Sequence, residues 1–141
     1  MQARARILGH PIHQILIVFP LGLLATSFFF DLAWLVKKNE QLAMVAWWLI
    51  FAGVIGGFAA SIFGTIDWLA IPRGTRARRV GVLHGGGMGI VALLYAASWF
   101  LRRDAPAQPD ALAIVLSAAG VLLTVVTGWL GGVLADRMEE T

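Results

Sequence analysis

The chain alternates four long apolar segments with short polar ones. The apolar segments are residues 12–36, 42–71, 80–101 and 111–135. Each reaches the roughly 20 residues that a helix needs to cross about 30 Å of hydrocarbon. A backbone in lipid must satisfy its own hydrogen bonds, which favours helix for segments of this length. The pattern therefore predicts an all-α integral membrane protein with a bundle of four transmembrane helices.

The ends of these segments carry helix signals. Pro11 suits the first turn of a helix, where its missing N–H is no loss. Thr75 and Asp110 are suitable N-caps, and Pro20 should kink the first helix. The predicted spans form a single domain over residues 1–141, and they are 11–36, 42–71, 78–101 and 110–136.

Composition supports a membrane protein. The chain is 59% hydrophobic and 13% charged, whereas a soluble domain is about half apolar and about a quarter charged. In a soluble protein the net charge of +3 would raise nucleic-acid binding, but here the basic residues flank the spans and report topology. The chain has no cysteine, which excludes disulfides, thiolate ligands and iron–sulfur ligation by this chain.

Four spans place both termini on one side of the membrane, which we call side A, together with the loop 72–79. The opposite side is side B. The arginines of side A are Arg4, Arg6, Arg73, Arg76, Arg78, Arg79 and Arg137. The basic residues of side B are Lys37, Lys38, Arg102 and Arg103. Because cytoplasmic loops carry the excess of basic residues, side A is expected to be cytoplasmic.

The three histidines all fall at the side A end of the predicted spans. His10 and His13 share a helix face, His84 lies at a similar depth, and Asp67 ends the helix between them. Ionisable residues at such a boundary are candidates for function. Three imidazoles and a carboxylate would complete a zinc-type site. Alternatively, His13 and His84 could hold a haem iron axially, with Gly85 opening a run of three glycines that leaves room for a flat cofactor or another helix.

A purely structural interpretation competes with a cofactor site. Histidines near an interface can cap helices or bond backbone carbonyls. Asp67 can pair with Arg73, Arg76 or Arg79. Both interpretations stay open from the residues alone, and so does the choice of cofactor between haem b and a divalent metal ion, zinc or iron.

Asp31 is the other acid inside a predicted span. Snorkelling toward Lys37 or Lys38, or a bond to a neighbouring helix, explains it. A proton relay would need a second acid at mid-depth, so a channel or transporter is disfavoured. An enzyme is the weakest class, because the sequence offers no nucleophile–base pair or phosphate loop.

A faint internal duplication is visible. Residues 64–69 read Gly-Thr-Ile-Asp-Trp-Leu and residues 127–132 read Thr-Gly-Trp-Leu-Gly-Gly. A histidine also lies near the start of the first and third spans. The similarity suggests two helical hairpins related by a twofold axis along the membrane normal.

Several motifs extend over nearly the whole chain. They are Gly9-His10-Pro11-Ile12-His13, Phe19-Pro20-Leu21-Gly22-Leu23-Leu24, Phe30-Asp31-Leu32, Thr65-Ile66-Asp67-Trp68, His84 and Gly128-Trp129-Leu130-Gly131-Gly132. Together they resemble a bacterial membrane family, domain of unknown function 2231. The family often has a histidine before Phe-Pro and a glutamate after the last Gly-Gly, where this chain has Val18 and Val133. The resemblance implies a multi-pass protein of the bacterial inner membrane. Because some members are fused to Rieske or cytochrome-type domains, it also implies redox partners.

We therefore expect a small membrane protein that binds haem b or a metal ion. His13, His84 and Gly85 would contact the cofactor, or His10, His13, Asp67 and His84 would bind the metal, in membrane electron transfer with a redox protein partner. The alternative is a non-catalytic accessory or structural transmembrane subunit of a larger energy-transducing complex. A homo-oligomer is compatible with both, the lipid bilayer is the immediate partner, and nucleic acid is not a partner.

Overall fold

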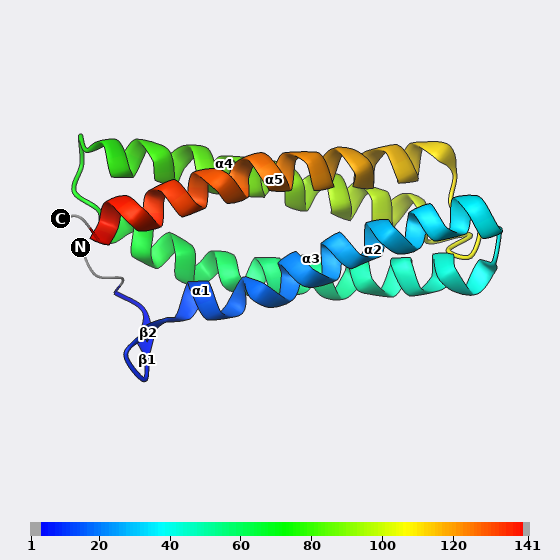
Figure 1. Cartoon of the computed structure of the whole chain (residues 1–141), viewed down its shortest axis with the longest axis horizontal. Coiled ribbons are helices and arrows are strands. Elements are labelled where there is room, and N and C mark those ends of the chain that lie inside the picture. The colour runs from blue at the N-terminus through cyan, green and yellow to red at the C-terminus, as the bar shows by residue number, and fades with distance from the viewer. Residues whose placement is uncertain (1–3, 140–141) are drawn as a thin grey trace.

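The computed structural model describes residues 4–139, and for residues 134, 135 and 137–139 the backbone alone. Four stretches of helix are long and apolar enough to cross a membrane, and they run side by side as a bundle (Figure 1). The helices are α1 Ile12–Leu16, α2 Val18–Lys37, α3 Glu40–Ala70, α4 Arg76–Leu101 and α5 Ala111–Glu139, with α1 and α2 forming one span. The all-α, four-helix transmembrane fold predicted from the sequence is confirmed.

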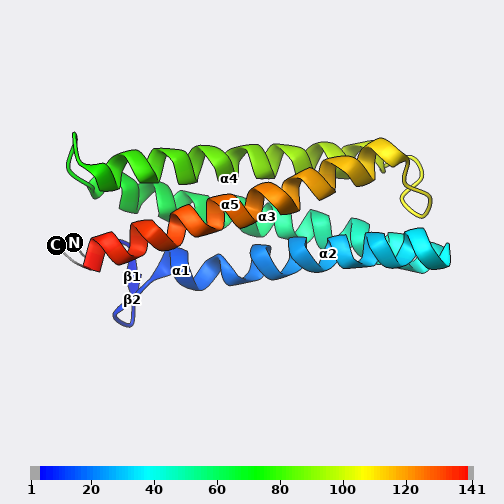
Figure 2. The same ribbon diagram turned by 45° about the horizontal axis from the view of Figure 1, so that its top comes forward.

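The bundle consists of two helical hairpins. We call α1 to α3 the first hairpin and α4 with α5 the second hairpin. The closest packing lies within each hairpin, α2 against α3 and α4 against α5. Contacts of α3 with α4 and of α2 with α5 join the two hairpins (Figures 1 and 2). The start of α1 and the end of α5 lie at the same end of the bundle, which is side A.

Local chemistry sets the helix ends. The first span breaks at Ile17, one turn before Pro20, which lacks the N–H that would bond the carbonyl of Leu16. Thr75 Oγ1 accepts the Arg78 N–H at 3.2 Å at the start of α4. At the start of α5, Asp110 Oδ1 accepts the N–H of Ala113 at 2.8 Å. These are ordinary N-caps, which bond N–H groups that the helix itself leaves free.

Small residues bring the helices of each hairpin close together. A Cβ added at Gly53 would lie 2.6 Å from the Leu24 side chain, and one added at Gly120 would lie 2.8 Å from the ring of Tyr95. Close backbone approach of this kind drives helix association in lipid, where no hydrophobic effect operates between helices. The buried core is correspondingly small, and its fully buried apolar side chains among the described residues are Ala43, Ala46, Ile50, Ala60, Val91, Tyr95 and Ala113.

A short β-hairpin precedes the first span at side A. Its strands are β1, Arg6–Ile7, and β2, His10–Pro11, which pair antiparallel. The hairpin projects sideways from the end of the bundle (Figures 1 and 2). The Ile12 N–H donates to the Ala5 carbonyl at 2.9 Å, which closes the hairpin at the point where α1 begins.

Candidate functional site

His13 and His84 meet at the side A end of the bundle. His13 comes from α1 and His84 from α4, so the contact joins the two hairpins. Their ring centroids lie 6.4 Å apart with the ring planes at 85°, an edge-to-face arrangement. Of the four residues expected to converge, these two imidazoles lie together in the structure.

Each of these imidazoles bonds a backbone carbonyl of the next helix in its own hairpin. His13 Nδ1 lies 2.8 Å from the Ala60 oxygen, and His84 Nδ1 lies 2.7 Å from the Thr127 oxygen. A carbonyl oxygen only accepts, so the hydrogen of each neutral ring is assigned to Nδ1 and the lone pair to Nε2.

A glycine on the helix that provides the accepting carbonyl, four residues after that carbonyl, makes room for each ring. A Cβ at Gly64 would lie 2.9 Å from His13 Nδ1, and a Cβ at Gly131 would lie 2.8 Å from His84 Cε1. Real Cβ contacts are not this short, so both rings pack directly on the helix backbone. The two histidines therefore act as interhelical links, the structural alternative that the sequence left open.

His10 and Asp67 do not join the pair in a metal-binding group. His10 lies in β2 and is exposed. Asp67 Oδ1 accepts the Ala5 N–H at 2.9 Å, so this carboxylate ties the segment before β1 to the end of α3. Within residues 4–139, no group of three or more histidine, cysteine, aspartate or glutamate side chains could hold a metal ion. The predicted function, haem or metal binding through a His/Asp cluster in electron transfer, is therefore wrong.

The individual residues predicted as ligands are distinct from the predicted function, and their ability to bind a metal or a cofactor stays a prediction. As predictions from the sequence, His10, His13, Asp67 and His84 remain untested metal ligands, and His13, His84 and Gly85 remain untested cofactor contacts. A Cβ at Gly85 would meet nothing within 4 Å.

Part of the glycine run beside His84 has a packing explanation. A Cβ at Gly87 would collide with the Thr127 side chain of α5. This position of the run therefore serves contact between α4 and α5.

The partner of Asp31 was not foreseen from the sequence. Asp31 of α2 and Arg102, the residue after α4, form a bidentate ion pair with N–O distances of 2.6 and 2.8 Å. Both side chains are 0% exposed. Asp31 therefore bonds to a neighbouring helix, one of the two expected alternatives, and not to Lys37 or Lys38.

Two serines complete the surroundings of this ion pair. Arg102 donates to Ser98 Oγ from Nη2 at 3.1 Å and to Ser117 Oγ at 3.1 Å. The Ser117 hydroxyl lies 3.1 Å from Asp31 Oδ2. A buried ion pair is tolerated when further hydrogen bonds occupy its remaining donors and acceptors. The network links α2, α4 and α5 near side B.

Equivalent positions recur at a spacing of 71 residues in the first helix of each hairpin and of 67 residues in the second. The contacts of Asp31 with Arg102 and of Leu24 with Tyr95 join residues 71 apart, the same spacing that separates His13 from His84. In the other helix of each hairpin, the corresponding residues are Ala46 and Ala113, Gly53 and Gly120, Ala60 and Thr127, and Gly64 and Gly131. The two hairpins therefore repeat one set of contacts.

This repeat supports the duplication suggested by the sequence, but in a different register. The similar Trp-Leu pairs would align Trp68 with Trp129, whereas the contacts align Gly64 with Gly131. Trp129 then corresponds to Ile62. The repeated contacts, and not the similar tryptophans, identify the equivalent positions.

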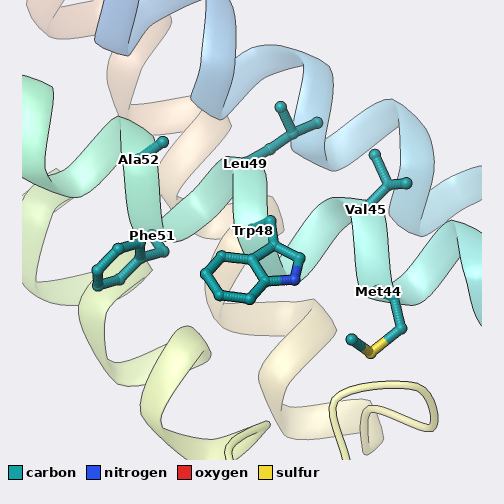
Figure 3. Close-up of a pocket in the computed structure, with 6 residues that line it drawn as sticks. All are labelled: Met44, Val45, Trp48, Leu49, Phe51 and Ala52. Carbon is teal, nitrogen blue, oxygen red and sulfur yellow. The ribbon is translucent and has the colours of Figure 1, made fainter.

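An apolar hollow of 510 Å³ faces outward on α3, and we call it the α3 groove. Figure 3 shows its six side chains projecting from this helix; they are Met44, Val45, Trp48, Leu49, Phe51 and Ala52. A second hollow of 170 Å³ adjoins it, shares Phe51 and is lined also by Trp99 of α4.

Two stacked indoles lie beside these hollows. The rings of Trp47 and Trp99 are stacked, with their centroids 5.2 Å apart. Both indole N–H groups are buried, and neither has a hydrogen-bond partner in the part of the chain that the structure describes. The stack links α3 of the first hairpin to α4 of the second.

Comparison with known proteins adds a family and no activity. No curated protein and no solved structure matches the chain. The model of one family, described as "Predicted membrane protein (DUF2231)", matches residues 9–140. The four apolar helices agree with that description of a multi-pass membrane protein. The chain therefore belongs to this family of membrane proteins of unknown function, as its motifs indicated.

Proposed function

We propose that the protein is a self-associating structural component of the bacterial inner membrane. Two copies associate side by side in the bilayer, and the α3 groove of each receives an apolar side chain of the other. The observation that carries the proposal is the α3 groove itself, a shallow, open and almost wholly apolar depression lined by six side chains of α3 (Figure 3).

The dimensions of the α3 groove suit a helix surface. From Met44 to Ala52 it extends for about 12 Å along α3, which is roughly two helical turns. Trp48 contributes the largest exposed surface and is 56% exposed. Large aromatic side chains of this kind dominate the energetics of protein interfaces.

The same chain offers a side chain at the matching depth. Phe29 of α2 is 67% exposed and lies eight residues before the end of α2 at Lys37. Trp48 lies eight residues after the start of α3 at Glu40. Both therefore lie about 12 Å below the side B end of the first hairpin. A twofold axis along the membrane normal brings residues of equal depth together, so Phe29 of one copy can enter the α3 groove of the other.

The orientation in the membrane follows from the arginines. Burial of Arg102 in its ion pair leaves Lys37, Lys38 and Arg103 as the basic residues on the surface of side B. Side A keeps exposed arginines in the α3–α4 connection and at the start of α4, such as Arg73 and Arg76. This increases the excess that favours a cytoplasmic side A.

The test is self-association of the purified protein in lipid vesicles. Because the chain has no cysteine, Asp104→Cys in the exposed side B loop provides one dye per chain, and photobleaching steps count the chains in each particle. We expect dimers whose dissociation constant rises about tenfold in Trp48→Ala and in Phe29→Ala. Trp129→Ala is the matched control, since Trp129 is 70% exposed on α5 and lies outside the α3 groove.

Two results would contradict self-association through the α3 groove. One is a single photobleaching step per particle at every protein-to-lipid ratio. The other is an equal loss of dimers in Trp48→Ala and Trp129→Ala, which would place the contact elsewhere.

A further inference from the structure

We infer that the β-hairpin formed by β1 and β2 is an interfacial anchor, which lies in the lipid headgroup layer of side A and inserts its apolar tip into the bilayer. Its position supports this role. β2 ends at Pro11 and the first span begins at Ile12, so the hairpin lies at the level where the chain enters the membrane. It projects sideways from the bundle, and both views show this (Figures 1 and 2).

The tip of the β-hairpin is apolar and faces away from the protein. Leu8 is 95% exposed and Ile7 is 56% exposed. In water this arrangement would leave two large aliphatic side chains hydrated, which is unfavourable relative to burial. Insertion among acyl chains removes that cost.

The backbone of the turn supports the same conclusion. Leu8 has φ 50° and Gly9 has φ 84°, both in the left-handed region. Tight hairpin turns with two such residues favour Asn-Gly or Asp-Gly, because a leucine is strained there. In water a leucine at this position would strain the turn without any compensating contact. In lipid the same side chain makes apolar contacts with the acyl chains.

The β-hairpin is held firmly enough to keep this orientation. The Arg6 side chain donates to the Gly9 carbonyl across the turn, from Nε at 2.9 Å. Asp67 Oδ1 accepts the Ala5 N–H at 2.9 Å and ties the base of the β-hairpin to α3. The carboxylate predicted as a metal ligand thus positions the anchor.

The charge around the β-hairpin favours an anionic lipid surface. Arg73, Arg76 and Arg79 are exposed at the same end of the bundle, and Arg6 lies in the β-hairpin itself. Arginines next to a transmembrane helix attract the anionic headgroups of the bilayer surface. The partner is therefore a bilayer that contains anionic phospholipid. This inference is independent of self-association, because the α3 groove lies near the side B end of the bundle and the β-hairpin lies at side A.

The experiment places an environment-sensitive fluorophore at the tip. Leu8→Cys in the full chain, otherwise free of cysteine, is labelled with a nitrobenzoxadiazole dye and reconstituted in phosphatidylglycerol-containing nanodiscs. Phospholipids brominated near the glycerol end of the acyl chains then report contact with lipid. We expect blue-shifted emission and about twofold quenching, since interfacial segments bury their apolar side about 5–10 Å deep.

Two reference positions calibrate the signal. Val18→Cys, 65% exposed on α2, should be quenched to a similar extent because it faces lipid within the span. Arg73→Cys, in the side A loop, should emit as in water and resist quenching. A label at residue 8 that behaves like the one at residue 73 would overturn the anchor. A blue-shifted label that brominated lipid does not quench would also overturn it, because that result indicates contact with protein.

Discussion

The two hairpins share a few equivalent contacts, although most of their aligned positions hold different residues. His13 and His84 each bond a carbonyl of the next helix and pack on a glycine one turn beyond it. At the opposite end, the equivalent positions hold Asp31 in the first hairpin and Arg102 in the second. The shared contacts build each hairpin, whereas the complementary charges make the two hairpins bind each other. Identical residues therefore serve packing within each hairpin, and the pair of His13 with His84 also joins the two hairpins. The complementary charges of Asp31 and Arg102 serve contact between the hairpins.

The outer surfaces differ as well. Trp48 and Phe51 of α3 correspond to Val115 and Ala118 of α5, so the aromatic groove belongs to the first hairpin. Phe51 also contacts Trp99 of α4, with ring centroids 5.5 Å apart, whereas 56% of the Trp48 surface is exposed. An aromatic surface on one half of a repeated structure is expected where that half meets another molecule.

Breaking the ion pair should have the largest effect on stability. Asp31→Ala leaves Arg102 buried without a counter-charge, and we expect a loss of about 3–5 kcal/mol. The measurement is detergent-induced unfolding followed by circular dichroism of the helices.

The exchanged pair tests whether the two positions are equivalent. Asp31→Arg with Arg102→Asp should recover part of the lost stability, because opposite charges again face each other. Recovery should be incomplete, since the position equivalent to Ser117 is Ile50, which has no hydroxyl. An exchanged variant no more stable than Asp31→Ala would refute the equivalence.

The glycines beneath the two imidazoles should respond alike. Gly64→Ala and Gly131→Ala push a methyl group against His13 and His84, and we expect each to cost about 1–3 kcal/mol. Gly132→Ala is the matched control, because a Cβ there meets nothing within 4 Å and alanine favours the helix by up to about 1 kcal/mol. The same unfolding assay gives all three values, and a large difference between the first two would show that the halves are not equivalent.

Asp67 marks a difference between the halves with a local effect. Its equivalent in the second hairpin is Leu134, and only the first hairpin carries a β-hairpin at this end. Asp67→Ala should cost about 1 kcal/mol, confined to the β-hairpin. Hydrogen exchange should speed up about fivefold at Ala5 and Ile12, in keeping with that energy, and stay unchanged in the middle of α3. Faster exchange throughout α3 would contradict a local role.

Replacing Trp47 by the residue at the equivalent position of the second hairpin should change stability least among these variants. Trp47→Ile installs the residue found at the equivalent Ile114. The substitution loses the stack on Trp99, worth about 0.5–1.5 kcal/mol, but removes a buried N–H that lacks a partner among the described residues. The two effects oppose, so the net change should stay within about 1 kcal/mol in the unfolding assay. A loss above about 3 kcal/mol would mean that the indole N–H is satisfied in the membrane.

The fold could be predicted because an apolar segment long enough to cross the hydrocarbon layer must form a helix there. Length and composition specify a transmembrane helix, and Thr75 and Asp110 cap helices in the structure as their types suggest. The pairing of His13 with His84 followed from their common depth. Depth in the membrane does not specify the direction in which a side chain points, however. Asp67 and His10 therefore lie near the same end of the bundle as the two imidazoles without joining them in a cluster.

The ion pair was missed because Arg102 follows the last helical residue of α4. A basic residue at a helix end usually reports topology, and it was counted that way. Its long side chain instead turns back into the bundle, where Asp31 and two serines receive it. The signal was present in the spacing, since Ser27 and Ser98 are separated by the same 71 residues as Asp31 and Arg102.

The separation of Asp31 from Arg102 along the chain also has a consequence for biosynthesis. The carboxylate is made 71 residues before its counter-charge, and translation adds about 5–20 residues per second. For roughly 4–14 s the nascent first hairpin therefore presents an unneutralised acid to the insertion machinery. A ribosome that stalls before codon 102 leaves a membrane segment that lacks its partner. The finished protein is thus chemically distinct from every form truncated before Arg102, which gives a membrane protease a basis for telling them apart.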